Sequence, residues 1–263
     1  MKRLKDTITL YLGALRRIGF TMTLGLAQED ARQRLLSLYQ VYAPMIPDED
    51  FTPQDLYIIP KTDILELLDN DSAIYEGVNE CGFGYTTEFE LKVISNLVNH
   101  FKPKKIFEIG TFEGRTTLNM ALNARKAEIV TLDLPSEELA NTKMKIAVGE
   151  ARYVKKQRSG ERFLDHPVRS QITQVYGDSA TFDFSPYHKS MDMVFIDGSH
   201  AYEYVLNDTR RAFDILAPGG IILWHDYTNW EGVRDALNEL YQGDSRCHGI
   251  RHIGGTSIAI LQV

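Results

Sequence analysis

Residues 107–121 read FEIGTFEGRTTLNMA and contain the turn on which the fold depends. An apolar run ends at Ile109, Gly110 follows, and Gly114 comes four residues later, where a helical pattern begins. A strand that leads through glycines into a helix is typical of the first ligand-binding turn of an α/β domain. The sequence therefore predicts a ligand site at this bend.

Five apolar runs of strand length begin at this part of the chain, and helical patterns separate most of them. The runs are KKIFEIG at 104–110, AEIVTLDL at 127–134, QITQVYGD at 171–178, MDMVFIDG at 191–198 and GGIILWHD at 219–226. Alternating strands and helices predict a parallel sheet covered on both faces, with ligands at the carboxyl ends of the strands. The stretch 247–263 adds two strands joined at Gly254 and Gly255 without a helix, so the last strand is expected to pair antiparallel.

The first hundred residues have a different pattern and predict an N-terminal helical extension, residues 1–100, before a ligand-binding domain at 101–263. Residues 27–43 and 86–101 both have apolar residues at helical spacing. Thr87 with Glu90 three residues later predicts a capping box at the start of the second helix. The intervening residues 44–63 are rich in proline and acid and are interpreted as a connection.

The composition excludes several classes of protein. The formal net charge of -7 argues against binding to nucleic acid through phosphate neutralisation. The two cysteines, Cys81 and Cys247, have no metal-binding spacing, which favours a reduced, cytoplasmic location. Residues 1–26 are basic and amphipathic but too short in apolar length to span a bilayer. A packing or dimerisation helix is favoured there over contact with a membrane surface, and a homo-oligomer is left open.

Three acidic residues, Glu108, Asp133 and Asp178, lie in order at the ends of the first three predicted strands. The first turn has the pattern E-x-G-x-x-x-G from Glu108, and Phe112 stands where a dinucleotide site needs its second glycine. Asp133, at the end of the second strand, is placed to accept hydrogen bonds from a ribose. Asp178, after the third strand, could accept one from an adenine amino group. Each acid taken singly could equally be a helix cap or a loop residue, but the ordered set favours a nucleoside ligand.

With these residues the sequence resembles the class I S-adenosylmethionine-dependent methyltransferases over about residues 80–263. The turn FEIGTFEGRTT is similar to that of cation-dependent small-molecule O-methyltransferases of the catechol and caffeoyl-CoA type. Other stretches look like bacterial methyltransferase-domain proteins. The resemblance implies a Rossmann-like, doubly wound sheet of seven strands with the last antiparallel. It also implies cofactor contacts from Glu108, Gly110, Thr111, Gly114, Thr116, Asp133, Asp178 and Ser179.

A metal site is the second implication of the resemblance. In the cation-dependent family an aspartate ends the fourth strand, and an aspartate followed by asparagine ends the fifth. Asp197 and Asp226 match, whereas Tyr227 replaces the asparagine and is a poor ligand for magnesium. His225 occupies the place where related sugar methyltransferases have an acid. A site of Asp197, His225 and Asp226 favours a divalent ion softer than magnesium, such as manganese. The alternative is that His225 and Asp226 cap the next helix.

His200 lies three residues after Asp197, where catechol-type enzymes have a catalytic lysine. Histidine is the side chain most ready to take a proton near neutral pH, so His200 is predicted to be the general base. The alternative is a capping histidine at the start of a helix.

Two further segments could form the pocket for the methyl acceptor. Residues 79–88, NECGFGYTTE, have a composition suited to a lid, although a plain turn fits equally well. The long connection from Pro135 to Ser170 is basic at Arg152, Lys155, Lys156, Arg158, Arg162 and Arg169, which fits an anionic acceptor or a solvated helix face.

The sequence therefore predicts a methyltransferase that transfers a methyl group from S-adenosylmethionine to a small molecule. The acceptor is expected to be an oxygen of a sugar or another anionic metabolite, with a divalent cation such as magnesium or manganese assisting. Two alternatives remain: a nicotinamide oxidoreductase, and a protein that binds the cofactor without turnover.

Overall fold

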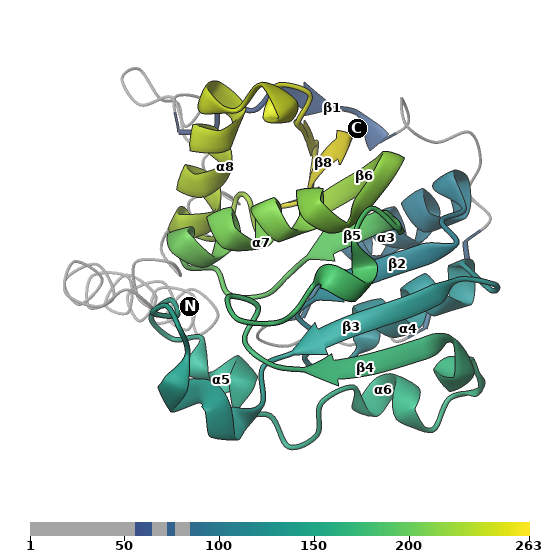
Figure 1. Ribbon diagram of the computed structural model, residues 1–263. Helices are drawn as coiled ribbons and strands as arrows, with labels where there is room; N and C mark the ends of the chain where they lie inside the picture. Colours follow the sequence, from purple (N-terminus) through teal and green to yellow (C-terminus); the bar gives the residue numbers. More distant parts are fainter. Residues whose placement is uncertain (1–55, 65–72, 77–84) are drawn as a thin grey trace, which may run out of the picture. The chain divides into compact units, whose positions relative to one another are not determined.

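A central sheet of eight strands organises the part of the chain that the computed structural model describes, residues 56–64, 73–76 and 85–263 (Figure 1). These residues belong to one compact unit, Gln54–Val263. The strand order is β1-β7-β8-β6-β5-β2-β3-β4. The strands span β1 Lys61–Thr62, β2 Lys105–Ile109, β3 Glu128–Asp133, β4 Ile172–Tyr176, β5 Met191–Ile196, β6 Leu216–Trp224, β7 Arg251–Ile253 and β8 Ala259–Gln262.

The five apolar runs form β2, β3, β4, β5 and β6, all paired parallel, as predicted. The last strand, β8, lies between β6 and β7 and pairs antiparallel with both, which confirms the prediction for the C-terminal stretch. The eighth strand, β1, was not expected. Lys61 and Thr62, within the stretch interpreted as a connection, pair with His252 and Ile253 of β7 and extend the sheet at that edge.

Helices cover both faces of the sheet. They are α3 Glu88–Phe101, α4 Arg115–Asn123, α5 Ala151–Val154, α6 Glu161–Leu164, α7 Tyr202–Ile215 and α8 Glu231–Gly243. Short 3-10 turns are η4 Ser136–Asn141, η5 Pro167–Gln171, η6 Ser185–Tyr187 and η7 Ser245–Cys247. Helix α3 begins with the predicted capping box, in which Thr87 and Glu90 each accept a hydrogen bond from the other's backbone N–H.

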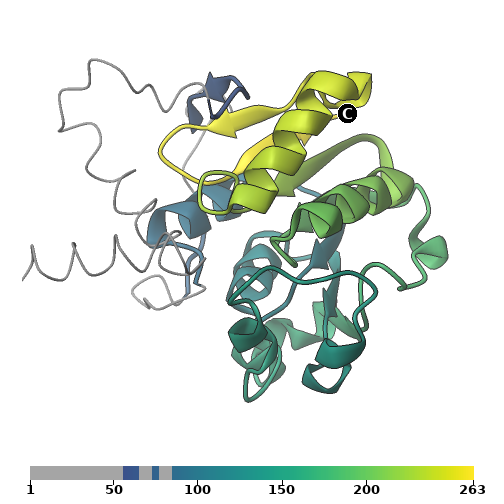
Figure 2. The same cartoon turned by 90° about the vertical axis from the view of Figure 1, so that its left-hand side faces the viewer.

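The core divides according to the two-residue period of the strands. Phe107, Val194 and Trp224 pack on one face of the sheet with Val205 of α7 and Val233 of α8. Their neighbours along the strands, Ile106, Phe195 and Leu223, point to the opposite face. There they pack with Leu97 of α3 and Met120 of α4. Figure 2 shows α7 on the opposite side of the sheet from α3. Burial on both faces explains why these strands are apolar runs without alternation.

The predicted segments at residues 1–26 and 27–43 lie outside the described residues, and so does most of the predicted lid at 79–88. The domain boundary at residue 100 stays a prediction. Among the described helices, none is long and apolar enough to cross a membrane.

Candidate active site

The strand order reverses between β2 and β5, and the loops after these strands meet at one edge of the sheet. The backbone ladder continues one step past the strand ends. The N–H of Asp197 donates to Ile109 O over 2.8 Å, and the N–H of His225 donates to Ile196 O over 3.0 Å. These bonds fix the starts of the loops after β5 and β6 beside the glycine turn. The reversal of an open parallel sheet is where α/β domains bind ligands.

Gly110 allows the turn after β2 to approach the loop after β5. Its φ is +101°, a left-handed conformation that favours glycine. A Cβ atom built at Gly110 would lie 1.9 Å from the carbonyl oxygen of Asp197, so no side chain fits there. The predicted cofactor turn and the predicted metal ligand are therefore in direct backbone contact.

Glu108 lies beneath this turn and is 1% exposed. Its carboxyl group accepts hydrogen bonds of 2.5 Å from both Thr117 and Thr131. Burial raises the pKa of Glu108 to about 8. Thr131 also shares a 2.6 Å hydrogen bond with Thr111. The structure thus places Glu108 and Thr111, two predicted cofactor contacts, in a buried polar network that joins β2, β3 and α4.

Two further predicted cofactor contacts lie at the start of α4. Gly114 is its N-cap residue, with φ +82°, and the helix begins without a side-chain cap. Thr116 is buried and shares a 3.1 Å hydrogen bond with Thr86. The uncapped first turn leaves backbone N–H groups toward the loop, an arrangement that suits a carboxylate.

Asp133, the predicted ribose ligand, is buried at the end of β3. Its carboxylate forms an ion pair with Lys156, with Nζ 2.8 Å from Oδ2, and both side chains are less than a tenth exposed. The N–H of Phe112 in the glycine turn also points to Asp133, over 3.4 Å. The sequence placed Lys156 in a basic connection that fits an anionic acceptor or a solvated helix face, whereas the structure pairs it with the predicted ribose ligand.

Asp178, the predicted adenine ligand, is also buried and has three donors. The hydroxyl of Tyr204 donates to Oδ1 over 2.9 Å, the N–H of Ala180 donates to the same oxygen over 2.9 Å, and the N–H of Lys143 donates to Oδ2 over 2.6 Å. The neighbouring Ser179 is buried, and its carbonyl accepts a 3.3 Å bond from Asn207.

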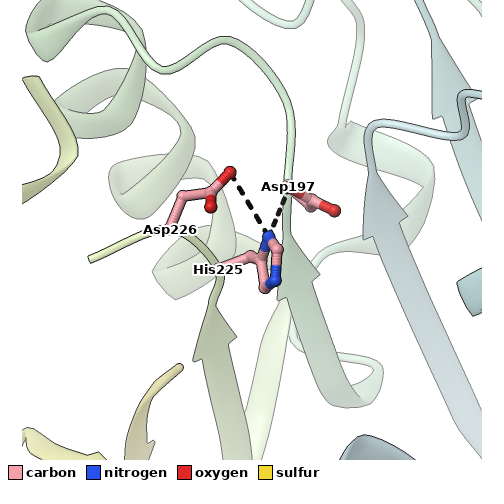
Figure 3. A group of neighbouring side chains, drawn as sticks. All are labelled: Asp197, His225 and Asp226. Carbon is pink, nitrogen blue, oxygen red and sulfur yellow. Dashed lines mark ion pairs between the residues drawn. The ribbon is translucent and has the colours of Figure 1, made fainter. Parts of the chain in front are cut away.

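Asp197, His225 and Asp226 form a compact group after β5 and β6 (Figure 3). Each offers one ligand atom, and these atoms lie within 4.8 Å of one another. Nδ1 of His225 is 3.2 Å from Asp197 Oδ1 and 3.3 Å from Asp226 Oδ2. Both ring nitrogens are buried, and neither makes a hydrogen bond of good geometry within the described part of the chain. A nitrogen facing two carboxylates in this way fits a divalent cation.

Glu90 lies on the other side of the His225 ring, although the sequence analysis predicted only a capping role for it. Its Oε2 is 3.4 Å from Nε2 of His225, on the side of the ring away from Asp197 and Asp226. Its Oε1 accepts bonds of 2.7 and 2.6 Å from the N–H and hydroxyl of Ser257. A carboxylate behind a ligating histidine sets the tautomer and the orientation of the ring.

His200 lies between two carboxylates and is largely buried. Nδ1 is 2.5 Å from Glu150 Oε1, and Nε2 is 2.8 Å from Asp226 Oδ2. The indole of Trp230 stacks on the imidazole, with ring centres 4.4 Å apart and planes 10° apart. The predicted base therefore contacts the predicted metal ligand Asp226 directly.

The histidines and carboxylates of this cluster stabilise each other's charged forms. Burial opposes the charge on His200, but hydrogen bonds to Asp226 and Glu150 raise its pKa to about 10. Burial likewise opposes the charge on His225, but Asp226, Asp197 and Glu90 hold its pKa well above the usual value. Burial would raise the pKa of Asp226, yet the charge of His225 holds it well below the usual range. The carboxylates thus create a negative potential that protons neutralise and that a divalent cation could also neutralise.

The helix-capping alternatives do not fit the structure. Helix α8 begins after Trp230, and α7 begins after Ala201, in each case without a side-chain cap bond. His225, Asp226 and His200 therefore cap neither helix. Tyr227 stands where the family resemblance implies an asparagine. It is fully buried, and its hydroxyl donates to Asn238 over 2.7 Å.

The basic residues of the connection between β3 and β4 differ in their exposure to solvent. Arg162 pairs with Glu113 at 3.2 Å, and the hydroxyl of Tyr85 donates to the same carboxylate over 2.5 Å. Arg158 is more than half exposed and lies 3.7 Å from the exposed Asp165. The predicted grip on an anionic acceptor stays a prediction for these residues.

The comparisons with known proteins identify the domain. Residues 107–227 match the family described as "Methyltransferase domain". This part of the chain is a methyltransferase domain. The match begins at the strand before the glycine turn and ends just after Asp226, so it includes every predicted cofactor and metal residue. The methyltransferase class expected from the sequence is confirmed for these residues.

Individual proteins similar to this methyltransferase have low sequence identity to it. An uncharacterized protein of Acanthamoeba polyphaga mimivirus, R132, is 29% identical over 172 residues, which are 62% of this chain and 72% of the viral protein. The methyltransferase PaMTH1 of Podospora anserina, solved with S-adenosylhomocysteine (SAH), is 20% identical, with a TM-score of 0.45 over 67% of this chain and 79% of that chain. A Bacillus cereus O-methyltransferase, also solved with SAH, is 16% identical, with a TM-score of 0.46 over 86% of this chain and 96% of that chain.

Proposed function

We propose that the methyltransferase domain transfers a methyl group from S-adenosylmethionine to an oxygen of a small-molecule acceptor, with a divalent cation held by Asp197, His225 and Asp226. The single observation that carries this proposal is the contact between His200 and Asp226, with Nε2 and Oδ2 2.8 Å apart. It joins a base to a candidate cation ligand. Asp197, another member of that ligand group, touches the cofactor turn at Gly110.

Methyl transfer requires that these residues hold the cofactor and remove a proton from the acceptor oxygen. The cofactor must be held with its sulfonium near the acceptor, and the glycine turn with Asp133 and Asp178 supplies polar groups for its two ends. The acceptor oxygen must lose its proton, which His200 takes. The new bond then forms between that oxygen and the methyl carbon, while the carbon–sulfur bond breaks and its electron pair stays on sulfur. A bound cation would orient the acceptor oxygen and make its hydroxyl more acidic.

The proposal is tested by binding and by transfer. Isothermal titration with S-adenosylmethionine and, separately, with NAD distinguishes the proposed enzyme from an oxidoreductase. Transfer of a labelled methyl group is then measured on a panel of acceptors containing a catechol, a hexose, a hydroxy acid and an amine. Binding of NAD alone would contradict the proposal. Cofactor binding with no transfer to any acceptor would favour a binding protein, and transfer to the amine alone would contradict an oxygen acceptor.

Replacement of Asp133 by alanine is expected to weaken cofactor binding by about 1.5 to 3 kcal/mol, the range for hydrogen bonds to a charged group. The reason is that a ribose loses its carboxylate partner, while Lys156 loses the same partner. Isothermal titration of the variant measures the loss. The matched control is Glu128→Ala, an exposed acid at the other end of β3. Equal affinity in the Asp133 variant and the control would remove Asp133 from the cofactor site.

Replacement of Glu90 by glutamine is expected to lower the affinity for Mn²⁺ about 10- to 100-fold, the usual effect of removing a carboxylate behind a ligating histidine. Titration calorimetry of the metal-free protein with Mn²⁺ gives the affinity without any acceptor. Thr87→Ala is the control, because it breaks the capping box but leaves the carboxylate beside His225. If both variants bind Mn²⁺ as the wild type does, Glu90 has only a capping role.

A further inference from the structure

The long connection between β3 and β4, residues 135–170, contacts the predicted cofactor acids and the predicted base; we name it the strap. Its Lys156 pairs with Asp133, and the backbone N–H of its Lys143 donates to Asp178. Its third contact is with His200, through Glu150. The strap therefore contacts one residue at the end of each of β3 and β4 and one residue in the loop after β5.

Glu150 is a buried acid of this segment, 3% exposed, and both of its carboxylate oxygens accept hydrogen bonds. Oε1 accepts from the backbone N–H of His200 and is 2.5 Å from its Nδ1. Oε2 accepts bonds of 2.8 Å from the hydroxyl of Ser199 and 2.7 Å from the N–H of Ala147. One carboxylate thus holds the backbone and the ring of His200 together.

The geometry points to Glu150 as the residue that positions the base, an inference that rests on the proposed role of His200. Because Nδ1 donates its hydrogen to Glu150, the ring is held with Nε2 toward Asp226, as the 2.8 Å separation shows. The stacked indole of Trp230 prevents the ring from tilting out of this plane. Within the described part of the chain, the hydrogen bonds of the Glu150 carboxylate go to Ala147, Ser199 and His200 and to no predicted cofactor or metal residue, so it acts through His200.

This role gives the strap a part in assembling the active site. The segment that holds the base also provides contacts to Asp133 and Asp178, and a cofactor bound at those acids would lie against it. An orientation error of about 1 Å at a reacting group can lower the rate about 100-fold, so a base that is held only when the strap is in place makes turnover depend on the strap.

A double-mutant cycle tests the inference on the full-length protein. Glu150→Ala is expected to lower kcat for labelled methyl transfer to the acceptor panel by about 10- to 100-fold, with the affinity for S-adenosylmethionine changed less than about threefold. In the His200→Ala background, the same change should cost no further activity, because the group that it positions is gone. Glu138→Gln, an exposed acid in the same strap, is the control and should match the wild type.

A spectroscopic readout is independent of the acceptor. In the ¹⁵N-labelled protein, the His200 ring signals, assigned by their loss in His200→Ala, should show a hydrogen-bonded proton on Nδ1 that Glu150→Ala removes. If the alanine variant does not fold, Glu150→Met, which has a similar length but no oxygen to accept a hydrogen bond from Nδ1, replaces it in both experiments.

The outcomes separate this inference from the proposed function. Losses that multiply in the double variant would show that Glu150 acts elsewhere and would overturn the inference while leaving His200 as the base. An unchanged kcat in Glu150→Ala would also overturn it. A fully active His200→Ala variant would instead overturn the proposed base, and the positioning role with it.

Discussion

His200→Ala is expected to lower kcat about 100- to 10,000-fold, the usual contribution of a general base, while S-adenosylmethionine still binds. This loss corresponds to about 3 to 5 kcal/mol of activation free energy. The physical reason is that the acceptor oxygen must lose its proton as it attacks the methyl group. Initial rates of labelled methyl transfer and isothermal titration with the cofactor measure the two quantities. His188→Ala, an exposed histidine at the end of η6, is the matched control.

His200 also determines whether the rate of methyl transfer rises or falls with pH. The carboxylates of Glu150 and Asp226 face His200 and raise its pKa to about 10, against the opposing effect of burial. A raised pKa means that the imidazole stays protonated to higher pH, and a protonated imidazole cannot accept a proton. The wild-type rate should therefore fall as the pH falls, with its midpoint above the ordinary histidine value of about 6.5. A cation bound at Asp226 would draw that midpoint back toward neutrality.

Two results would contradict this account of the base. One is a His200→Ala variant within a few-fold of the wild type that keeps the acid limb. The acid limb would then belong to another group, and acidification of the acceptor by a cation would be the better explanation. The other is a wild-type profile with no acid limb at all.

Removal of divalent cations is expected to abolish turnover, and Mn²⁺ should restore it. Asp197, His225 and Asp226 supply two oxygens and a nitrogen from buried or partly buried positions, a ligand set that favours ions such as Mn²⁺ over Mg²⁺. The experiment is a chelation series in which elemental analysis shows that the protein is metal-free. Asp197→Ala should leave the chain folded but lower the affinity for Mn²⁺, measured by titration calorimetry.

The control for the metal experiment is Glu203→Gln, an exposed acid in the first turn of α7. It should bind Mn²⁺ as the wild type does. Turnover that survives in protein shown to be metal-free would assign the three residues a direct contact with the acceptor or a structural role. In that case His225 would act as a buried positive charge among carboxylates.

The sequence was sufficient for those parts of the molecule whose pattern is local. The strand ends at Asp133, Asp178 and Asp197 could be placed because each acid comes at or just after the end of an apolar run, and parallel strands bring such ends to one edge. The capping box at Thr87 and Glu90 was also visible, because its spacing belongs to one helical turn. The short strand β1 was missed because two residues in a proline-rich stretch show no period.

The residues that complete the site were hidden because their partners are distant in the chain. Glu150 lies fifty residues before His200, in a connection without regular periodicity, and nothing in its neighbours distinguishes it from a surface acid. Glu90 already had a local explanation as a cap, which concealed its contact with His225. Lys156 was counted with its basic neighbours, although the structure buries it against Asp133. Charge patterns along a sequence do not show which charges are removed from solvent.

The backbone conformation of Asp226 is unfavourable in free energy, and the fold keeps it because of the contacts that the side chain makes. Its φ is +64°, in the left-handed region, and this conformation points one carboxylate at both His200 and His225. A residue with a side chain is held there at a cost of about 1 kcal/mol or more, and only because the surrounding structure enforces it. Selection for conformational stability alone would favour glycine at this position. At this position, a change that improves the stability of the backbone would remove a side chain on which the proposed activity depends.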